Sequence, residues 1–173
     1  KYTYMPDNYY DEIFHSSFRQ EYNVNINGAT DKLSYYSNLG FLGDGGTVNN
    51  SSFKRYTART NVDYQAKDWL RFGVSLSYSH TDSSSPSFNA DTYGSSGNLF
   101  YIANQLGPIY PLYVRDANGN IMKDHGRTVY DANQTGFKRP AIIGNAVRDN
   151  EYNRQSIATD QFQGNWVATV TPI

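Results

Sequence analysis

The chain has 173 residues and a formal net charge of −1, so its length fits one ordinary domain and its charge gives no reason to expect a nucleic-acid partner. Aromatic residues make up 16% of the chain, with 16 Tyr and 9 Phe, yet the hydrophobic total is only 38%. Cysteine is absent, which excludes disulfides, thiolate metal sites and a cysteine nucleophile. This composition fits both a Tyr-rich soluble β-domain that binds carbohydrate and a transmembrane β-barrel.

Two further features of the chain concern its ends and its apolar runs. No apolar run approaches the length of a membrane-spanning helix. The first residues, 1–4, lack the apolar region of a signal peptide, and the last ones, 170–173, stop within a strand pattern. We therefore expect the chain to be a fragment of a longer protein.

Alternating apolar and polar residues predict two strands near the start of the chain, because period-two alternation marks a strand with two unlike surroundings. The strands are expected over residues 18–26 and 32–42, joined by a tight turn at 27–31. Residues 43–52 then form a glycine-rich loop that lacks the Lys-Ser/Thr pair of a phosphate-binding loop. One face of this hairpin collects Phe18, Tyr22, Val24, Ile26, Leu33, Tyr35, Leu39 and Phe41, and Arg19 and Glu21 lie on the other.

The clearest pattern is a second hairpin over residues 53–82. Its strands are expected over 53–64 and 69–81, with a short turn at 65–68. Each strand has at least the roughly ten residues that a tilted strand needs to cross a bilayer. On one face lie Tyr56, Ala58, Val62, Tyr64, Leu70, Phe72, Val74, Leu76 and Tyr78, and on the other lie Arg55, Arg59, Asp63 and Arg71.

After this hairpin the pattern becomes irregular over residues 83–154. Apolar residues at helical spacing predict a short helix over 98–106, and the Asn118-Gly119 pair predicts a hairpin turn. The surrounding residues 116–120 resemble the start of a calcium loop, but the glycine comes too early and no glutamate closes the loop. A final strand is expected over 155–171, with Phe162 and Trp166 on its apolar face. Asp160 shares that face, near the loop end, where water or lipid headgroups can accept it.

Short and long connections alternate between these five strands. Outer-membrane barrels place short turns on the periplasmic side and long loops outside, whereas a soluble meander has no reason to sort its loops. The alternation therefore favours a transmembrane barrel, with residues 83–154 as an extracellular loop.

No catalytic constellation or metal site is evident, and no cofactor is expected. The histidines His15, His80 and His125 are far apart, without the spacing of a metal motif. Two acid pairs, 11–12 and 149–151, fall in loop-like stretches, although residues 11–14 also fit one helical turn. Acid–base catalysis needs a shielded cleft, which such stretches do not imply. We do not expect an enzyme.

Several stretches carry a family resemblance. They are Tyr9-x-Asp11-Glu12-Ile13-Phe14, Gln20-Glu21-Tyr22-Asn23-Val24, Gly28-x-Thr30-Asp31-Lys32, Tyr35-Tyr36-Ser37-Asn38-Leu39-Gly40-Phe41-Leu42, Gly46-x-Val48-x-Asn50-Ser51-x-Phe53-Lys54-Arg55-Tyr56, Asn61-Val62-Asp63-Tyr64, Trp69-Leu70 and Pro111-Leu112-Tyr113. Together they resemble SusC/RagA-type TonB-dependent transporters. The match is dense from Tyr9 to Tyr78 and loose over residues 83–154. Tyr9 replaces a usual Trp and Ala29 a usual Gly.

The resemblance implies an all-β fold: about five antiparallel strands, the second to the sixth, of a 22-stranded transmembrane barrel in the bacterial outer membrane, typical of Bacteroidetes. The N-terminal plug domain and the TonB box would be absent from this chain. Such transporters import oligosaccharides or peptides, work with a SusD-like surface lipoprotein and are driven through TonB. The alternatives are a soluble β-rich carbohydrate-binding module and a surface adhesin.

The barrel interpretation assigns roles to three sets of residues. The set expected to face the lumen or plug is Arg19, Glu21, Arg55, Arg59, Asp63 and Arg71. The set expected to face lipid is Phe72, Val74, Leu76, Tyr78, Phe162 and Trp166, with His80 in the same register near a strand end. Candidate loop contacts to a ligand or lid are Tyr93, Tyr101 and Tyr113, whereas Phe100 and Tyr110 are expected to pack within the loop.

Overall fold

The computed structural model describes residues 5–86, 99–132, 145–152 and 154–172. The chain divides into two compact units. The first consists of Lys1–Ser16, Thr47–Ser51 and Ser85–Gln155, and the second of Ser17–Gly46, Ser52–Ser84 and Ser156–Ile173. Among the described residues, no helix is both long enough and apolar enough to span a membrane.

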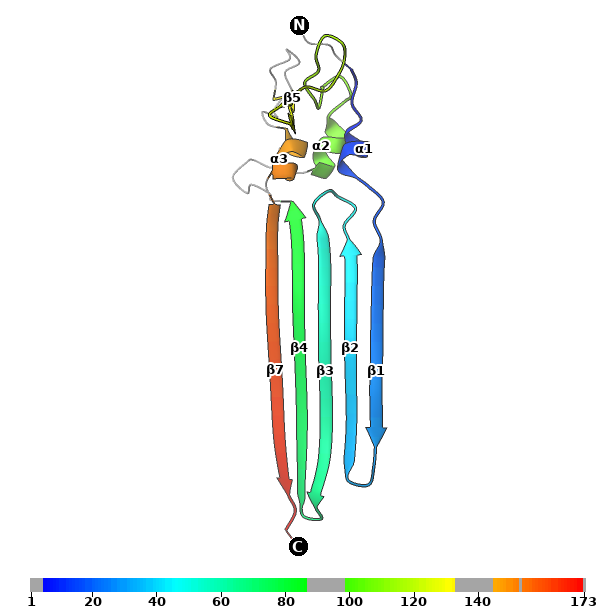
Figure 1. Cartoon of the computed structure of the whole chain (residues 1–173), viewed down its shortest axis with the longest axis vertical. Coiled ribbons are helices and arrows are strands. Elements are labelled where there is room, and N and C mark those ends of the chain that lie inside the picture. Colours follow the sequence, from blue (N-terminus) through cyan, green and yellow to red (C-terminus); the bar gives the residue numbers. More distant parts are fainter. Residues whose placement is uncertain (1–4, 87–98, 133–144, 153, 173) are drawn as a thin grey trace. The chain divides into compact units, whose positions relative to one another are not determined.

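The second unit is one antiparallel sheet of five long strands (Figure 1). The strands are β1 (Arg19–Ala29), β2 (Leu33–Gly45), β3 (Ser52–Lys67), β4 (Leu70–Pro86) and β7 (Arg154–Val170). They lie side by side in chain order, so each pairs with its neighbours in sequence. Within the described residues, β1 and β7 are the edges, and the sheet is not closed.

Most strands are longer than the alternation predicts, and one turn is placed differently. The turn predicted at 65–68 is wrong at three of its four residues, because β3 continues to Lys67 and only Asp68 and Trp69 form the turn. A bulge between Gln65 and Lys67 shifts the register there. The end of β3 therefore departs from strict period-two alternation, which is why the sequence pattern does not extend the strand to Lys67. Polar strand ends such as 82–86 also lack the apolar residues on which the alternation depends.

The first unit is built around short helices and a small hairpin. Its helices are α1 (Tyr9–Ile13), α2 (Leu99–Gln105) and α3 (Ala146–Tyr152), and the hairpin strands are β5 (Lys123–Asp124) and β6 (Arg127–Thr128). Their buried side chains form one cluster: Tyr9, Ile13, Val48, Leu99, Ala103, Leu106, Leu112, Ala146 and Val147. The long connection is therefore not an irregular loop with one short helix, because its apolar residues pack with those of α1.

Asparagine side chains begin two of these helices. Asn8 accepts a hydrogen bond from the Tyr10 amide at the start of α1, and the Asn145 side-chain oxygen accepts one from the Arg148 amide, 3.2 Å away, at the start of α3. The acid pairs 11–12 and 149–151 lie in these helices, so their assignment to loops is wrong, and the alternative of a helical turn at 11–14 agrees with α1 as far as Ile13. The apolar residues around them are too few to show a helical period.

Candidate functional site: the two faces of the sheet

The strand register places the alternating apolar residues on one face of the sheet. Directly opposed residues on antiparallel strands point to the same side. In one such row, Val24 pairs with Leu39, Leu39 with Ala58, and Ala58 with Tyr78. The same register joins Phe72, Val74 and Leu76 to this face through Tyr64, Val62 and Thr60. Four strands therefore share one continuous apolar face, with Leu39 and Val24 each 57% exposed.

An aromatic row crosses this face from β1 to β4. Tyr22, Phe41, Tyr56 and His80 are successive partners in the register. Their ring centroids are 6.3, 5.0 and 6.2 Å apart, within the range of favourable aromatic contacts. Rows of aromatic side chains flank the apolar band of outer-membrane barrels at the membrane interface.

Strand β7 continues the same face and adds a polar cluster beside the aromatic row. The Asp160 carboxylate accepts a hydrogen bond from the Tyr78 hydroxyl at 2.6 Å and lies 2.7 Å from Nδ1 of His80. The other ring nitrogen of His80 lies 3.2 Å from the Asp82 carboxylate. Asp160 therefore contacts side chains of β4 rather than depending on water alone.

Two glycines on this face lie beneath aromatic rings. A Cβ atom at Gly164 would come within 2.5 Å of the Trp166 ring, and one at Gly28 within 2.7 Å of the Tyr35 hydroxyl. Because Gly164 has no side chain, the Trp166 ring can lie along its own strand, and because Gly28 has none, the Tyr35 ring can lie across the neighbouring strand. Phe162 and Trp166 lie an even number of residues from Asp160 on β7, so they share its face, where Trp166 is 66% exposed and Phe162 is 67% exposed.

The opposite face is polar and holds all six residues predicted to face a lumen. It carries four arginines, Arg19, Arg55, Arg59 and Arg71, and three acids, Glu21, Asp44 and Asp63, on strands β1 to β4. Arg19 lies 3.8 Å from Asp44, and Arg71 lies 3.6 Å from Asp63. The Glu21 carboxylate accepts a hydrogen bond from the side-chain amide of Asn23 at 3.3 Å.

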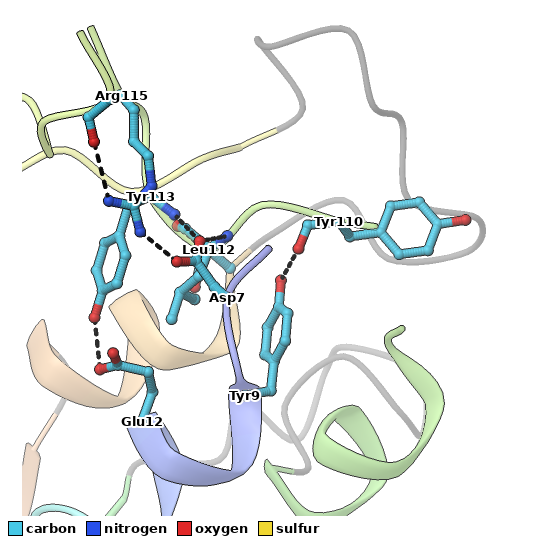
Figure 2. A network of polar contacts seen from close by, with 9 residues as sticks. Asp7, Tyr9, Glu12, Tyr110, Leu112, Tyr113 and Arg115 are labelled. Atoms are coloured by element: carbon cyan, nitrogen blue, oxygen red, sulfur yellow. Dashed lines mark hydrogen bonds and ion pairs between the residues drawn. The ribbon is translucent and has the colours of Figure 1, made fainter. Parts of the chain in front are cut away.

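A hollow of about 330 Å³ lies in the other unit, lined by Asp7, Tyr10, Leu106 and Pro108 among others. Next to it, the Asp7 carboxylate joins the N-terminal segment to residues 112–115 (Figure 2). It accepts hydrogen bonds from the backbone amides of Leu112 and Tyr113 and forms an ion pair with Arg115. The Asp7 and Arg115 side chains are only 6% and 14% exposed, so this is a buried charge pair.

The hydroxyl groups of two tyrosines in this unit form hydrogen bonds with carboxylates. The Tyr113 hydroxyl donates to Glu12 at 2.6 Å, and that of Tyr130 donates to Glu151. Burial, followed by these hydrogen bonds, raises the pKa of both phenols well above its usual value. Of the predicted loop contacts, Tyr113 is thus half-buried in a network, Tyr101 is 43% exposed on α2, and Tyr93 lies outside the described residues. Tyr110 packs against the unit's core.

The residues that resemble a calcium loop form an ordinary turn. The Asp116 carboxylate accepts hydrogen bonds from the backbone amides of Asn118 and Asn120, at 2.8 and 2.9 Å. The bonds from Asn120, chiefly that of its backbone amide, lower the pKa of Asp116. Within the described part of the chain, no group of three or more His, Asp or Glu side chains is arranged to hold a metal ion.

Comparison with known proteins bears on the sheet. No family model matches the chain. The chain is 30% identical to the TonB-dependent receptor P26 of Formosa agariphila over 80 residues, 46% of this chain, and 25% identical to the TonB-dependent receptor SusC of Bacteroides thetaiotaomicron over 131 residues, 75% of this chain. A structure of the RagAB peptide importer in an open-open state covers the whole chain with a TM-score of 0.64 at 21% identity, and one in a closed-closed state covers 98% with the same score at 19% identity.

The resemblance to SusC/RagA-type TonB-dependent transporters is confirmed.

The extent of the match defines what the SusC/RagA resemblance covers. The chain spans 8% of the length of P26 and 12% of that of SusC. It spans 18% of the matched chain in the open-open RagAB structure and 17% of that in the closed-closed structure. The fold that the two RagAB structures share with the chain is an antiparallel sheet with few helices.

Proposed function

We propose that this chain forms part of the barrel wall of a TonB-dependent outer-membrane importer of oligosaccharides or peptides. Its five strands would belong to a barrel of 22 strands, the number implied by the family resemblance. The apolar face would contact lipid, and the polar face, with its arginines, would line the lumen. Energy would come through TonB, which acts on a part of the transporter outside this chain.

The observation that carries this proposal is the sorting of side chains by face. Large apolar side chains such as Phe162 and Trp166 are about two-thirds exposed on one face, at 67% and 66%. The other face carries seven charged side chains, which would be costly in hydrocarbon. A sheet with one lipid-compatible face and one wet face is the pattern of a transmembrane barrel wall.

The lengths of the connections indicate which end of the strands would face the periplasm and which the outside of the cell. The turns 30–32 and 68–69 are short, whereas the connection from β4 to β7 holds residues 87–153. Short turns belong to the periplasmic side in outer-membrane barrels, so the long connection would be extracellular. Exposed Tyr101 on α2 is then a candidate contact for substrate or lid.

The partner and the substrate classes come from the relatives. The RagAB structures are of a peptide importer, and SusC is named as a TonB-dependent receptor. The description of RagAB as a peptide importer supports a peptide as the proposed substrate. The SusD-like surface lipoprotein as partner, and an oligosaccharide as the other substrate class, are proposed on the family resemblance.

Adjacent residues on β4 test the assignment of faces. Val74 lies on the apolar face and Ser75 on the polar face. In the full-length protein, Val74→Arg should impair insertion, because arginine near the bilayer midplane costs about 2–4 kcal/mol. Ser75→Arg should insert normally and at most alter transport. Heat-modifiable mobility of the folded barrel on gels measures insertion, and equal effects of the two substitutions would contradict the proposed faces.

A further inference from the structure

Three tyrosines and two glutamates of the first unit form one connected cluster: Tyr113, Tyr130, Tyr152, Glu12 and Glu151. The ring centroids of Tyr113 and Tyr130 are 5.4 Å apart, and those of Tyr130 and Tyr152 are 6.5 Å apart. Glu12 accepts a hydrogen bond from Tyr113, and Glu151 accepts one from Tyr130. Besides burial and the Glu151 hydrogen bond, the charge of Glu12 also raises the pKa of Tyr130, so both carboxylates lie near one phenol.

The two carboxylates of this cluster are not balanced by a basic side chain. No Lys, Arg or His among the described residues forms an ion pair with Glu12 or Glu151. The nearby arginines have other partners, since Arg115 pairs with Asp7 and Arg148 with Asp149. The cluster therefore carries excess negative charge, which attracts cations.

One end of the cluster already holds a cation in a defined way (Figure 2). The Arg115 guanidinium lies over the ring of Tyr113, 5.8 Å from its centroid, and pairs with the Asp7 carboxylate. A tyrosine ring and a carboxylate together are thus the groups that bind this guanidinium. A cation over an aromatic ring is attracted by the negative face of the ring.

The other end of the cluster presents the same two groups to solvent. Glu151 and Tyr152 are the last two residues of α3; Glu151 is exposed and Tyr152 is 49% exposed. The Tyr152 ring is nearly perpendicular to that of Tyr130, at 84°, and the Tyr130 hydroxyl holds the Glu151 carboxylate. Because ring and carboxylate lie beside the same phenol, one long side chain can lie on Tyr152 and reach Glu151.

We propose that the ring of Tyr152 and the carboxylate of Glu151 bind a lysine or arginine side chain of a peptide substrate. This inference rests on the proposed function, because it takes the cluster to meet peptides on their way to import. The aliphatic stem of such a side chain can pack on the ring, while its charged end pairs with the carboxylate. A neutral sugar could stack on the ring but would leave the negative charge unbalanced.

The affinity of blocked peptides for the full-length protein in detergent tests the site. Acetyl-Gly-Gly-Lys-Gly-Gly-amide should bind at least about fivefold more tightly than the same peptide with glutamine in place of lysine. Isothermal titration calorimetry measures both affinities. Glu151→Gln removes the charge but still accepts the Tyr130 hydrogen bond, so it should abolish most of this difference without loosening the fold.

Three further variants separate the ring from general effects. Tyr152→Ala should also abolish most of the preference for lysine, and Tyr152→Phe, which has a ring without the hydroxyl, should recover most of it. The matched control is Asp124→Asn, which removes an exposed carboxylate from the β5–β6 hairpin and should leave the preference unchanged. An equal loss in the control would make the preference a general charge effect and contradict the site.

Carbodiimide coupling locates the contact. This reagent joins a lysine amine to a carboxylate in direct contact with it, so the lysine peptide should become attached to Glu151. Mass spectrometry of proteolytic fragments identifies the coupled residue. The same peptide with acetyllysine in place of lysine is the control and should give no product.

The remaining results overturn the inference in distinguishable ways. Equal binding of the lysine and glutamine peptides, or coupling only at other acids, removes the peptide site and leaves the barrel intact. Coupling of Glu151 to a lysine of a copurified surface protein would make the cluster a protein interface. Binding of a glucosamine trimer as tight as that of the lysine peptide would assign it to amino sugars. A full-length protein that shows no heat-modifiable barrel and partitions into the aqueous phase contradicts the proposed function itself.

Discussion

At the scale of single residues, Asp7 has the most consequential surroundings. Its carboxylate accepts hydrogen bonds from two backbone amides and pairs with Arg115, which lies 108 positions away in the sequence. A buried pair of charges is strongly destabilising when one member is removed, because the other stays uncompensated. Asp7 therefore holds the segment before the first strand against residues 112–115.

Asp7→Ala should loosen this unit. It leaves the Arg115 guanidinium buried without its carboxylate, at a cost of about 3–5 kcal/mol. Hydrogen exchange of the peptides covering residues 110–131 in the full-length protein should become faster. The control is Asp124→Ala, whose side chain is 77% exposed and should change local stability by less than about 0.5 kcal/mol. Equal hydrogen-exchange rates in the two variants would contradict the role of Asp7 in holding residues 112–115.

At the scale of elements, the aromatic row makes side-chain contacts across four strands, between residues that are distant in sequence. Each ring contacts a ring or imidazole on the next strand, so Phe41 of β2 has neighbours on both sides. Cross-strand aromatic pairs are worth about 0.5–1.5 kcal/mol each beyond the area they bury. Phe41, like Tyr56, has two ring partners in this row, so its loss removes two such pairs at once.

Phe41→Ala should lower the free energy of unfolding by about 1–3 kcal/mol, the sum of two pairs. Leu39→Ala is the matched control, because Leu39 lies on the same face and strand but outside the row. Urea unfolding of the barrel in lipid vesicles, followed by heat-modifiable mobility, measures the difference. A larger loss for Leu39→Ala would mean that the rings contribute only lipid contact.

The sheet could be predicted from the sequence, whereas only α2 of the three helices shows a periodic pattern, for physical reasons. Alternate side chains of a strand point to the same face of the sheet, as Phe72, Val74, Leu76 and Tyr78 do. A period of two in hydrophobicity therefore indicates both that the segment is a strand and which residues share a face. The first unit is held by the Asp7–Arg115 and Glu12–Tyr113 pairs, which join residues distant in sequence and leave no periodic pattern. The pairing of Arg19 with Asp44 could not be predicted either, because it depends on the strand register, which alternation alone does not determine.

At the scale of the whole molecule, the sheet has two edge strands among the described residues, β1 and β7. Edge strands present unpaired backbone donors and acceptors, which are costly in lipid and promote association in water. Together with one face of exposed apolar side chains, these edges make the isolated chain a poor soluble protein.

The chain expressed by itself, as these 173 residues, should therefore not be monomeric in detergent-free buffer. Light scattering after size-exclusion chromatography measures this, with the same sample in detergent as the control. A monodisperse, folded monomer without detergent would instead support the soluble carbohydrate-binding alternative, in which the apolar face is covered by protein.

The in-register aromatic row has a consequence for depth in the membrane. Strands of a barrel tilt by about 40° from its axis, so a row perpendicular to the strands climbs as it crosses them. Three strand spacings of about 4.8 Å then separate Tyr22 and His80 by roughly 9 Å along the membrane normal. The His80 end, with its carboxylates, would lie among headgroups while Tyr22 reaches the acyl chains, so the membrane boundary crosses this wall obliquely to the row.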